Sequence, residues 1–115
     1  MSAARSGDFT ALIPTHAVTT IFYLVERASD TSRANQTVDW LLQHFDVPAA
    51  DKPILLRARN LPLKDFEDAV VASLAEKHAC DYVITRNVPD FAGSPVPTVS
   101  PAEFLLILQS RRPHK

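Results

Sequence analysis

The sequence predicts one α/β domain with a short, mostly parallel central sheet. Residues 82–85 form a short, mainly apolar run, which is typical of a strand buried on both faces. A helix-like segment at 66–79 precedes this run, and a further short strand at 96–99 leads into another helix-like segment ending near residue 109. Helices and strands therefore alternate in this half of the chain, which favours parallel strand pairing.

The first half reads as a short strand and two helices. Residues 9–13 predict the strand, which Pro14 ends because proline cannot donate to a ladder. From 15 to 28 apolar residues recur at intervals of three and four, which predicts a helix with one face in the core. That face carries Val18, Ile21, Phe22, Leu24 and Val25. Asp30 or Thr31 is expected to cap a second helix to about residue 45, with Val38, Leu41, Leu42 and Phe45 inward.

Further boundaries follow from capping residues. Residues 45–47 suggest a third short strand, and Pro53 suits the first turn of a helix running to about residue 59. Lys64-Asp65 begins the helix at 66–79, whose alanines at 69, 72, 75 and 79 form a small-residue strip suited to close packing on a sheet. Ser100-Pro101-Ala102-Glu103 predicts a helix start with a capping box.

Length and composition limit the function classes. The chain has 115 residues and 46% hydrophobic content, which predicts a single domain over residues 1–115, with a core at about 7–109 and a polar tail at 110–115. A net charge of −1 gives no general attraction for nucleic acid, so RNA contacts would depend on local cations. No 20-residue apolar run or apolar leader occurs, so we expect a cytoplasmic protein with no membrane span. Cys80 is the single cysteine, which excludes an internal disulfide and a cysteine-based zinc site.

Acidic and amide side chains gather at two predicted positions. Asp65 and Asp68 lie at a helix start, and Asn87 and Asp90 follow the buried strand. Open α/β sheets hold ligands where the carboxyl ends of strands meet helix starts. Carboxylate and amide oxygens are the ligands that Mg²⁺ prefers. The four side chains therefore predict a metal site where the helix start meets the strand end.

Ordinary structural roles also fit these residues. Asp65 suits a helix cap, and Asp68 suits a first helical turn because its charge complements the helix dipole. Asn87 and Asp90 flank Pro89 and fit a turn. Arg86 suits pairing with a carboxylate as well as contact with a phosphate, and the basic residues of the tail suit a solvated end.

Several motifs resemble the PIN-domain ribonucleases, the family of the VapC-type toxins. They are Asp-Phe-Glu-Asp-Ala at 65–69, Cys-Asp-Tyr-Val-Ile-Thr-Arg-Asn at 80–87, Asp-Phe at 90–91, Ser-Pro at 94–95 and Ser-Pro-Ala-Glu-Phe-Leu at 100–105. The resemblance covers about residues 7–108 and is looser in the first half, where it rests on Ala-Leu-Ile-Pro at 11–14. It implies a three-layer α/β/α sandwich and an endoribonuclease that depends on Mg²⁺ or Mn²⁺. It also implies RNA as substrate and an antitoxin protein as a partner. Exposed edges of the sheet would favour a homodimer or a strand added by a partner.

The same resemblance assigns roles to individual positions. It implies three catalytic, metal-holding carboxylates, three supporting polar residues and two RNA-binding cations. The carboxylates are Asp68, Asp65 and Asp90. The supporting polar residues are Thr20, Asn87 and Thr85, and the cations are Arg86 and Lys64.

Two departures from the family leave a second hypothesis open. The usual first strand, ending in a catalytic Asp, has no counterpart, so the domain reads as N-terminally truncated, and Thr20 stands where the family commonly has Glu. The neighbours of the absent strand close up, or a second chain fills the gap, or the true start lies upstream. The alternative to a ribonuclease is a catalytically degenerate PIN-like module for binding and interaction.

Overall fold

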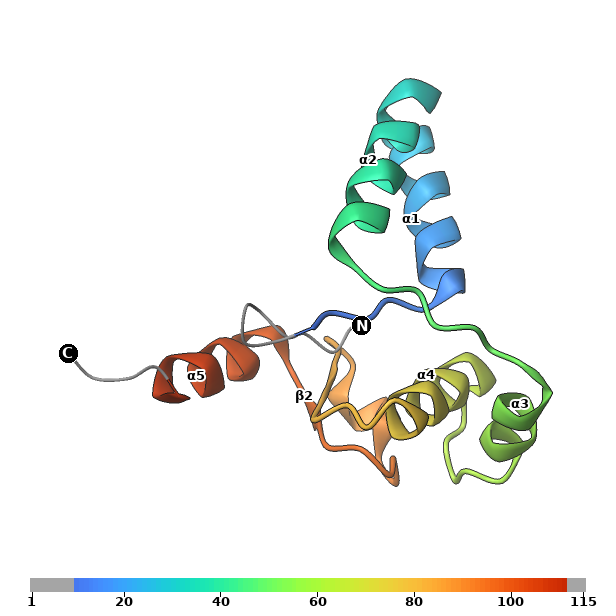
Figure 1. Cartoon of the computed structure of the whole chain (residues 1–115), viewed down its shortest axis with the longest axis vertical. Coiled ribbons are helices and arrows are strands. Elements are labelled where there is room, and N and C mark those ends of the chain that lie inside the picture. Colours follow the sequence, from blue (N-terminus) through green and yellow to red (C-terminus); the bar gives the residue numbers. More distant parts are fainter. Residues whose placement is uncertain (1–9, 112–115) are drawn as a thin grey trace. The chain divides into compact units, whose positions relative to one another are not determined.

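The computed structural model describes residues 10–111. The chain divides into two compact units, Met1–Asp51 and Lys52–Lys115, called here the hairpin unit and the α/β unit (Figure 1). Five α-helices, a 3₁₀ helix and one parallel pair of strands make up the described residues. The predicted α/β class is thereby confirmed.

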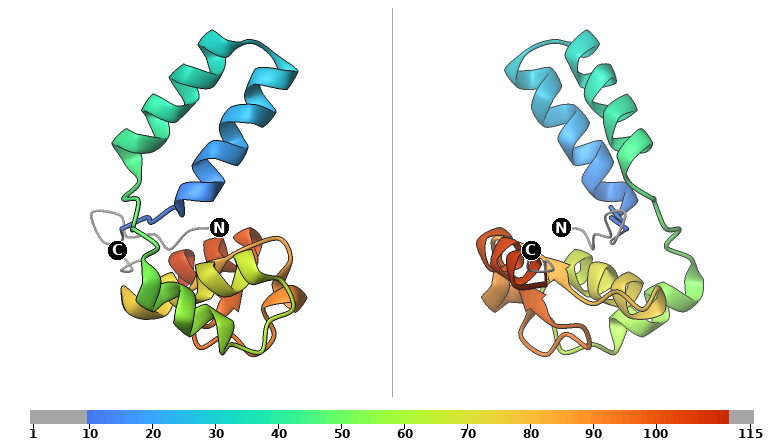
Figure 2. Two further views of the ribbon diagram at one scale, coloured as in Figure 1. Left: turned by 90° about the vertical axis from the view of Figure 1, so that its right-hand side faces the viewer. Right: turned by 60° about the vertical axis from the view of Figure 1, so that its left-hand side comes forward.

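The hairpin unit consists of α1 (Thr15–Ala28) and α2 (Thr31–His44), which lie side by side (Figure 2). Ahead of α1, Leu12 forms an isolated parallel bridge with Asp46. The Ile13 N–H donates to the Asp46 carbonyl and the Asp46 N–H donates to the Ala11 carbonyl, both at 2.9 Å. Strands were predicted at 9–13 and 45–47. Among the described residues, these segments form this single bridge, and Phe9 lies outside the described residues.

Local capping explains where α2 begins. The Asp30 carboxylate accepts a hydrogen bond from the Arg33 N–H at 2.7 Å, so the predicted cap is confirmed. The Thr31 hydroxyl donates to Glu26 at 2.9 Å, which links the two helices across their connection. By contrast, α1 follows Pro14 and has no side-chain cap.

Burial in the hairpin unit is sparse. Among residues 10–51 its buried side chains are Ile13, Pro14, Ala34 and Leu41, and no residue of α1 is buried. Two predicted inward residues are in fact exposed, Leu24 at 57% and Leu42 at 56%. Successive helical residues are about 100° apart, so Leu24 and Leu42 are turned away from the preceding or following residue that faces inward, half-buried Val25 and buried Leu41 respectively.

The α/β unit contains α3 (Lys52–Arg59), α4 (Phe66–Lys77), the 3₁₀ helix η1 (Val88–Phe91) and α5 (Pro101–Arg111). Its strands are β1 (Val83–Ile84) and β2 (Thr98–Val99), shorter than the predicted runs 82–85 and 96–99. They pair in parallel, Val83 with Thr98 and Ile84 with Val99. The Thr85 N–H extends the ladder by donating to the Val99 carbonyl at 3.0 Å.

Most of the buried side chains surround α4. Every residue from Ala69 to Ala75 is buried, because α4 is covered on one side by α3 and on another by β1 and η1. One core cluster lies between α4, β1 and η1 and includes Val83 and Phe91. A second cluster lies between α3 and α4 and includes Ile54 and Leu74. Leu61 and Leu63 pack against both clusters, so a single core continues through the unit.

The end of α4 differs from the prediction. The helix stops at Lys77, and Ala79 is exposed with a left-handed φ of 53°. The Ala79 N–H donates to the Glu76 carbonyl at 3.1 Å, and the Cys80 N–H donates to the Ala75 carbonyl at 2.9 Å. These two bonds form a Schellman motif with alanine where glycine is usual. Ala79 therefore ends the helix, and the packing strip consists of Ala69, Ala72 and Ala75.

The start of α5 confirms the predicted capping box. The Ser100 N–H donates to Glu103 Oε1 at 3.0 Å, and the Glu103 N–H donates to Ser100 Oγ at 3.1 Å. Leu105 and Leu106 are exposed at 59% and 65%. This helix is therefore fixed mainly at its beginning.

Candidate functional site

Asp65 and Asp68 lie together at the amino end of α4. One carboxylate oxygen of Asp65 accepts the Asp68 N–H at 3.0 Å, which confirms the structural role of Asp65 as helix cap. The cap uses only one oxygen of the Asp65 carboxylate, and Asp65 is exposed while Asp68 is half-buried. Carboxylates are favoured here because the helix dipole presents positive charge at its amino end.

The segment after β1 is a tight turn built on Thr85. Thr85 is buried, and its hydroxyl accepts the Asn87 N–H at 3.1 Å. The chain then enters η1, where the Asp90 N–H donates to the Asn87 carbonyl at 2.9 Å and Phe91 is buried in the core. The turn predicted around Pro89 is confirmed, and it leaves Arg86, Asn87 and Asp90 exposed.

A close packing contact joins the loop before α4 to the loop after η1. Gly93, three residues beyond Asp90, has a φ of +92°, and a Cβ there would lie 2.8 Å from Cγ of Pro62. Pro62 in turn precedes Asp65 by three residues. Because only glycine fits both the backbone angle and the space, the contact holds the loop before α4 against the loop after η1.

The described residues do not complete a metal cluster. Within 10–111, no group of three or more His, Cys, Asp or Glu side chains is placed to hold a metal ion. Asp65 and Asp68 come together at one helix start, and Asp90 lies in η1, three residues before Gly93, which packs against Pro62 of the loop before α4. The donor chemistry, carboxylate and amide oxygen, suits Mg²⁺ or Mn²⁺.

The remaining predicted positions are surface residues. Lys64 is exposed immediately before the α4 cap, and Arg86 is exposed immediately after β1 and Thr85. Thr20 is exposed on α1, in the hairpin unit. The tail residues Arg112 and Lys115 lie outside the described residues.

Three carboxyl or thiol groups of the α/β unit titrate away from their ordinary values. Hydrogen bonding to Arg57, with Nε at 2.8 Å from Oε1, lowers the pKa of Glu76, and the same bond raises the pKa of Arg57. Hydrogen bonds from Ser100 lower the pKa of Glu103. Burial, with a smaller effect of Asp81, raises the pKa of the Cys80 thiol, so it remains protonated near neutral pH and does not suit a nucleophile.

A sequence comparison decides the family. The PIN domain model matches residues 1–89, more than half of the 115-residue chain. The chain belongs to the PIN domain family. No curated protein matches it.

Membership of the PIN family gives the acid pair a context. The matched region includes α4 with Asp65 and Asp68, and also β1, Thr85 and Asn87. The fold is nuclease-like. Asp65 and Asp68 lie at the start of α4, and Thr85 and Asn87 follow β1. No helix among residues 10–111 has the length and apolar character needed to cross a bilayer.

The sequence analysis missed one conspicuous surface feature. Trp40 and His44 stack with ring centroids 4.3 Å apart and an interplanar angle of 21°. Their spacing of four residues on a predicted helix was the available signal, because residues i and i+4 are neighbours on a helix surface.

Proposed function

We propose that this PIN domain is a metal-dependent endoribonuclease of the VapC type that cleaves RNA phosphodiester bonds. The observation that supports this most directly is the Asp65–Asp68 pair at the start of α4. The loop after η1, the helix that carries Asp90, packs through Gly93 against Pro62 of the loop before α4. Asp68 is the proposed principal ligand of Mg²⁺ or Mn²⁺, and Asp65 and Asp90 are proposed to bind it directly or through water. When bound, the metal supplies a Lewis acid that activates water and neutralises charge on the scissile phosphate.

The other residues have positioning roles in this proposal. The Asp65 cap fixes the first turn of α4 and with it the backbone of Asp68. The buried Thr85 holds Asn87 at the start of the turn leading to Asp90. Arg86 and Lys64 are proposed to contact phosphates, and the supporting polar role of Thr20 stays a prediction from the family pattern.

The family context extends the proposal. A three-layer α/β/α arrangement, a homodimer, an antitoxin protein as restraining partner and a cytoplasmic location all belong to it.

A degenerate PIN-like interaction module is the second candidate. It is favoured by the absence of a three-acid cluster among residues 10–111 and by Thr20 at the usual Glu position. In that case the acids of α4 serve only as cap and first-turn residues. The two candidates differ in whether removal of one carboxylate charge changes any RNA cleavage.

The deciding experiment is cleavage of a mixed RNA pool by the purified chain, with Mg²⁺ or Mn²⁺ against EDTA. Asp68→Asn is expected to abolish metal-dependent cleavage without unfolding the protein, because it removes charge at nearly constant volume. Asp81→Asn is the matched control. Asp81 is an exposed acid of the same unit, but it precedes β1, whereas Asn87 and Asp90 follow that strand. Equal cleavage by wild type and Asp68→Asn would rule out Asp68 as ligand, and no cleavage by folded wild type would favour the interaction module.

Asp65 needs a variant that separates its two roles. Asn caps a helix about as well as Asp, so Asp65→Asn keeps the start of α4 and removes the charge. We expect Asp65→Asn to retain the unfolding midpoint of wild type and to cleave more slowly. A variant that cleaves like wild type would leave Asp65 with the capping role alone.

A further inference from the structure

The outer face of α2 carries an exposed aromatic platform. This face consists of Arg33, Gln36, Thr37, Trp40, Gln43 and His44, which all lie within about 60° of Trp40 at 100° per residue. Trp40 is the single tryptophan of the chain and is 53% exposed. At this exposure the indole is accessible to a ligand.

Neighbouring rings hold Trp40 in one orientation. The His44 imidazole stacks on its indole at 4.3 Å, and His44 Nδ1 donates to the Trp40 carbonyl at 2.8 Å. The Phe45 ring lies 6.1 Å away at an angle of 59°. Because the indole is already fixed by these contacts, a ligand that stacks on it would lose little side-chain entropy on binding.

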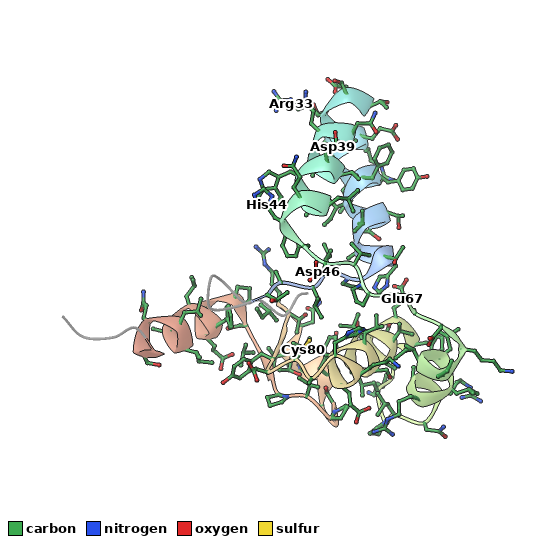
Figure 3. All side chains as sticks on the ribbon, in the orientation of Figure 1. Arg33, Asp39, His44, Asp46, Glu67 and Cys80 are labelled. Carbon is green, nitrogen blue, oxygen red and sulfur yellow. The ribbon has the colours of Figure 1, made fainter. Side chains whose placement is uncertain are left out.

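Positive charge accompanies the platform. Arg33 precedes Trp40 by seven residues, or about two turns and roughly 10 Å along the same face. Figure 3 shows Arg33 and His44 on the side of α2 that faces away from α1. The Arg33 side chain is in no ion pair within residues 10–111, so its charge is available to an anion.

The rest of the face distinguishes among kinds of ligand. It contains no aliphatic side chain, since Leu42 lies about 160° around the helix from Trp40, whereas the centre of a protein interface is usually apolar. It also contains no carboxylate, since Asp39 lies about 100° away and Asp30 is engaged in the helix cap. An aromatic platform with a cation and amides, and without acids, suits a base and its phosphates.

We propose that the outer face of α2 binds single-stranded RNA, with a base stacked on Trp40 and a phosphate at Arg33. The inference deepens the proposed ribonuclease function, on which its choice of RNA rests, by giving the substrate a binding surface on the hairpin unit. Gln36 and Gln43 flank Trp40 and are proposed to hydrogen-bond to base edges or to the 2′-hydroxyl.

Trp40 itself provides the measurement. A titration of the full chain with a 12-residue oligouridine in EDTA is followed by tryptophan fluorescence and by the anisotropy of labelled RNA. EDTA prevents metal-dependent cleavage, and all tryptophan fluorescence comes from Trp40. We expect saturable quenching with the same midpoint as the anisotropy change, and weaker binding to a duplex RNA of equal length.

Variants separate stacking from charge. Trp40→Ala is expected to weaken oligouridine binding about 10-fold, and Trp40→Phe less, because stacking contributes about this much per base. Arg33→Gln is expected to weaken binding and to reduce the slope of log affinity against log salt by about one. Leu42→Ala is the matched control, because Leu42 is equally exposed on the same helix but on another face. Circular dichroism confirms that each variant is folded.

The outcomes for this surface and for the active site are separate. RNA binding that leaves Trp40 fluorescence unchanged and is unaffected by Trp40→Ala would overturn the platform and leave the ribonuclease proposal standing. Absence of RNA binding to folded wild type would also overturn it. Cleavage lost in Asp68→Asn, but retained by Trp40→Ala with a raised KM, would support both proposals together.

Discussion

The two units of this chain differ greatly in how many side chains each one buries in its own interior. The α/β unit has a continuous core around α4, in which seven consecutive residues of one helix are buried. The hairpin unit buries Ile13, Ala34 and Leu41, while Tyr23, Leu24, Trp40 and Leu42 are more than half exposed. Both units contain well-formed helices, so helix formation alone does not indicate how much packing supports an element.

This contrast bears on where each kind of functional residue lies. The proposed metal ligands Asp65, Asp68 and Asp90 are on elements anchored by the α/β core, which suits ligands that must keep fixed positions. The proposed RNA platform lies on the hairpin, where the rings of Trp40, His44 and Phe45 fix one another locally. A stacking surface tolerates more variation in ligand position than a metal site, because every base presents a flat face.

The largest expected effect tests the difference in packing directly. Leu74→Ala, in the α/β core at 4% exposure, should lower the free energy of unfolding by about 2–5 kcal/mol because it leaves a cavity beside α3. Leu42→Ala makes the same chemical change at an exposed position of α2 and should stay within about 0.5 kcal/mol. Urea unfolding measures both. Similar losses for the two variants would show that the hairpin carries more packing than its exposed side chains indicate.

The sequence was sufficient for most helices of both units. The Asp30 cap, the Asp65 cap and the Ser100–Glu103 capping box were all predicted and are confirmed, because each depends on residues within three positions of one another. The start of α1 after Pro14 was predicted for the same local reason. Local hydrogen-bonding chemistry is therefore readable from one sequence.

Strands and burial were less predictable, since they depend on partners distant in the chain. The predicted strands at 82–85 and 96–99 shorten to two residues each, because only Val83–Ile84 and Thr98–Val99 find each other in register. Leu24 and Leu42 were placed inward because they are apolar and lie near the buried stripe. Prediction from hydrophobicity alone therefore made the buried stripe of each helix wider than it is in the structure.

For the candidate site, the sequence predicted which elements carry the acids but not how those elements pack. Asp65 and Asp68 lie at the helix start and Asp90 follows the strand, as expected, but the Pro62–Gly93 contact between the loop before α4 and the loop after η1 was not predicted. That contact depends on the positive φ of Gly93 and on a proline 31 residues away in the sequence. The grouping of Asp65, Asp68 and Asp90 around a metal stays a prediction.

A smaller change in stability is expected at the end of α4, where it tests how much backbone strain the well-packed α/β unit tolerates. Ala79 adopts the left-handed conformation that costs a non-glycine residue about 1–2 kcal/mol, and the well-packed α/β unit tolerates it. Ala79→Gly should therefore raise the free energy of unfolding by about 0.5–1 kcal/mol after the greater backbone entropy of unfolded glycine is subtracted. Ala92→Gly is the control, since Ala92 has an ordinary φ of −57° and should lose stability. A loss of stability in both variants would contradict a strained Schellman motif.

The smallest expected effect concerns α5, which belongs to the α/β unit but resembles the hairpin in exposing its leucines. Hydrogen bonds from Ser100 lower the pKa of Glu103, so the folded state favours the ionised carboxylate. The resulting stabilisation is fully present above the ordinary glutamate pKa of about 4.3 and is lost as the pH falls through the lower folded-state pKa. Glu103→Gln keeps a capping-box side chain without the charge. Wild type should therefore exceed this variant in urea midpoint at pH 7, and the difference should shrink toward pH 3; an unchanged difference would show that the charge of Glu103 does not stabilise α5.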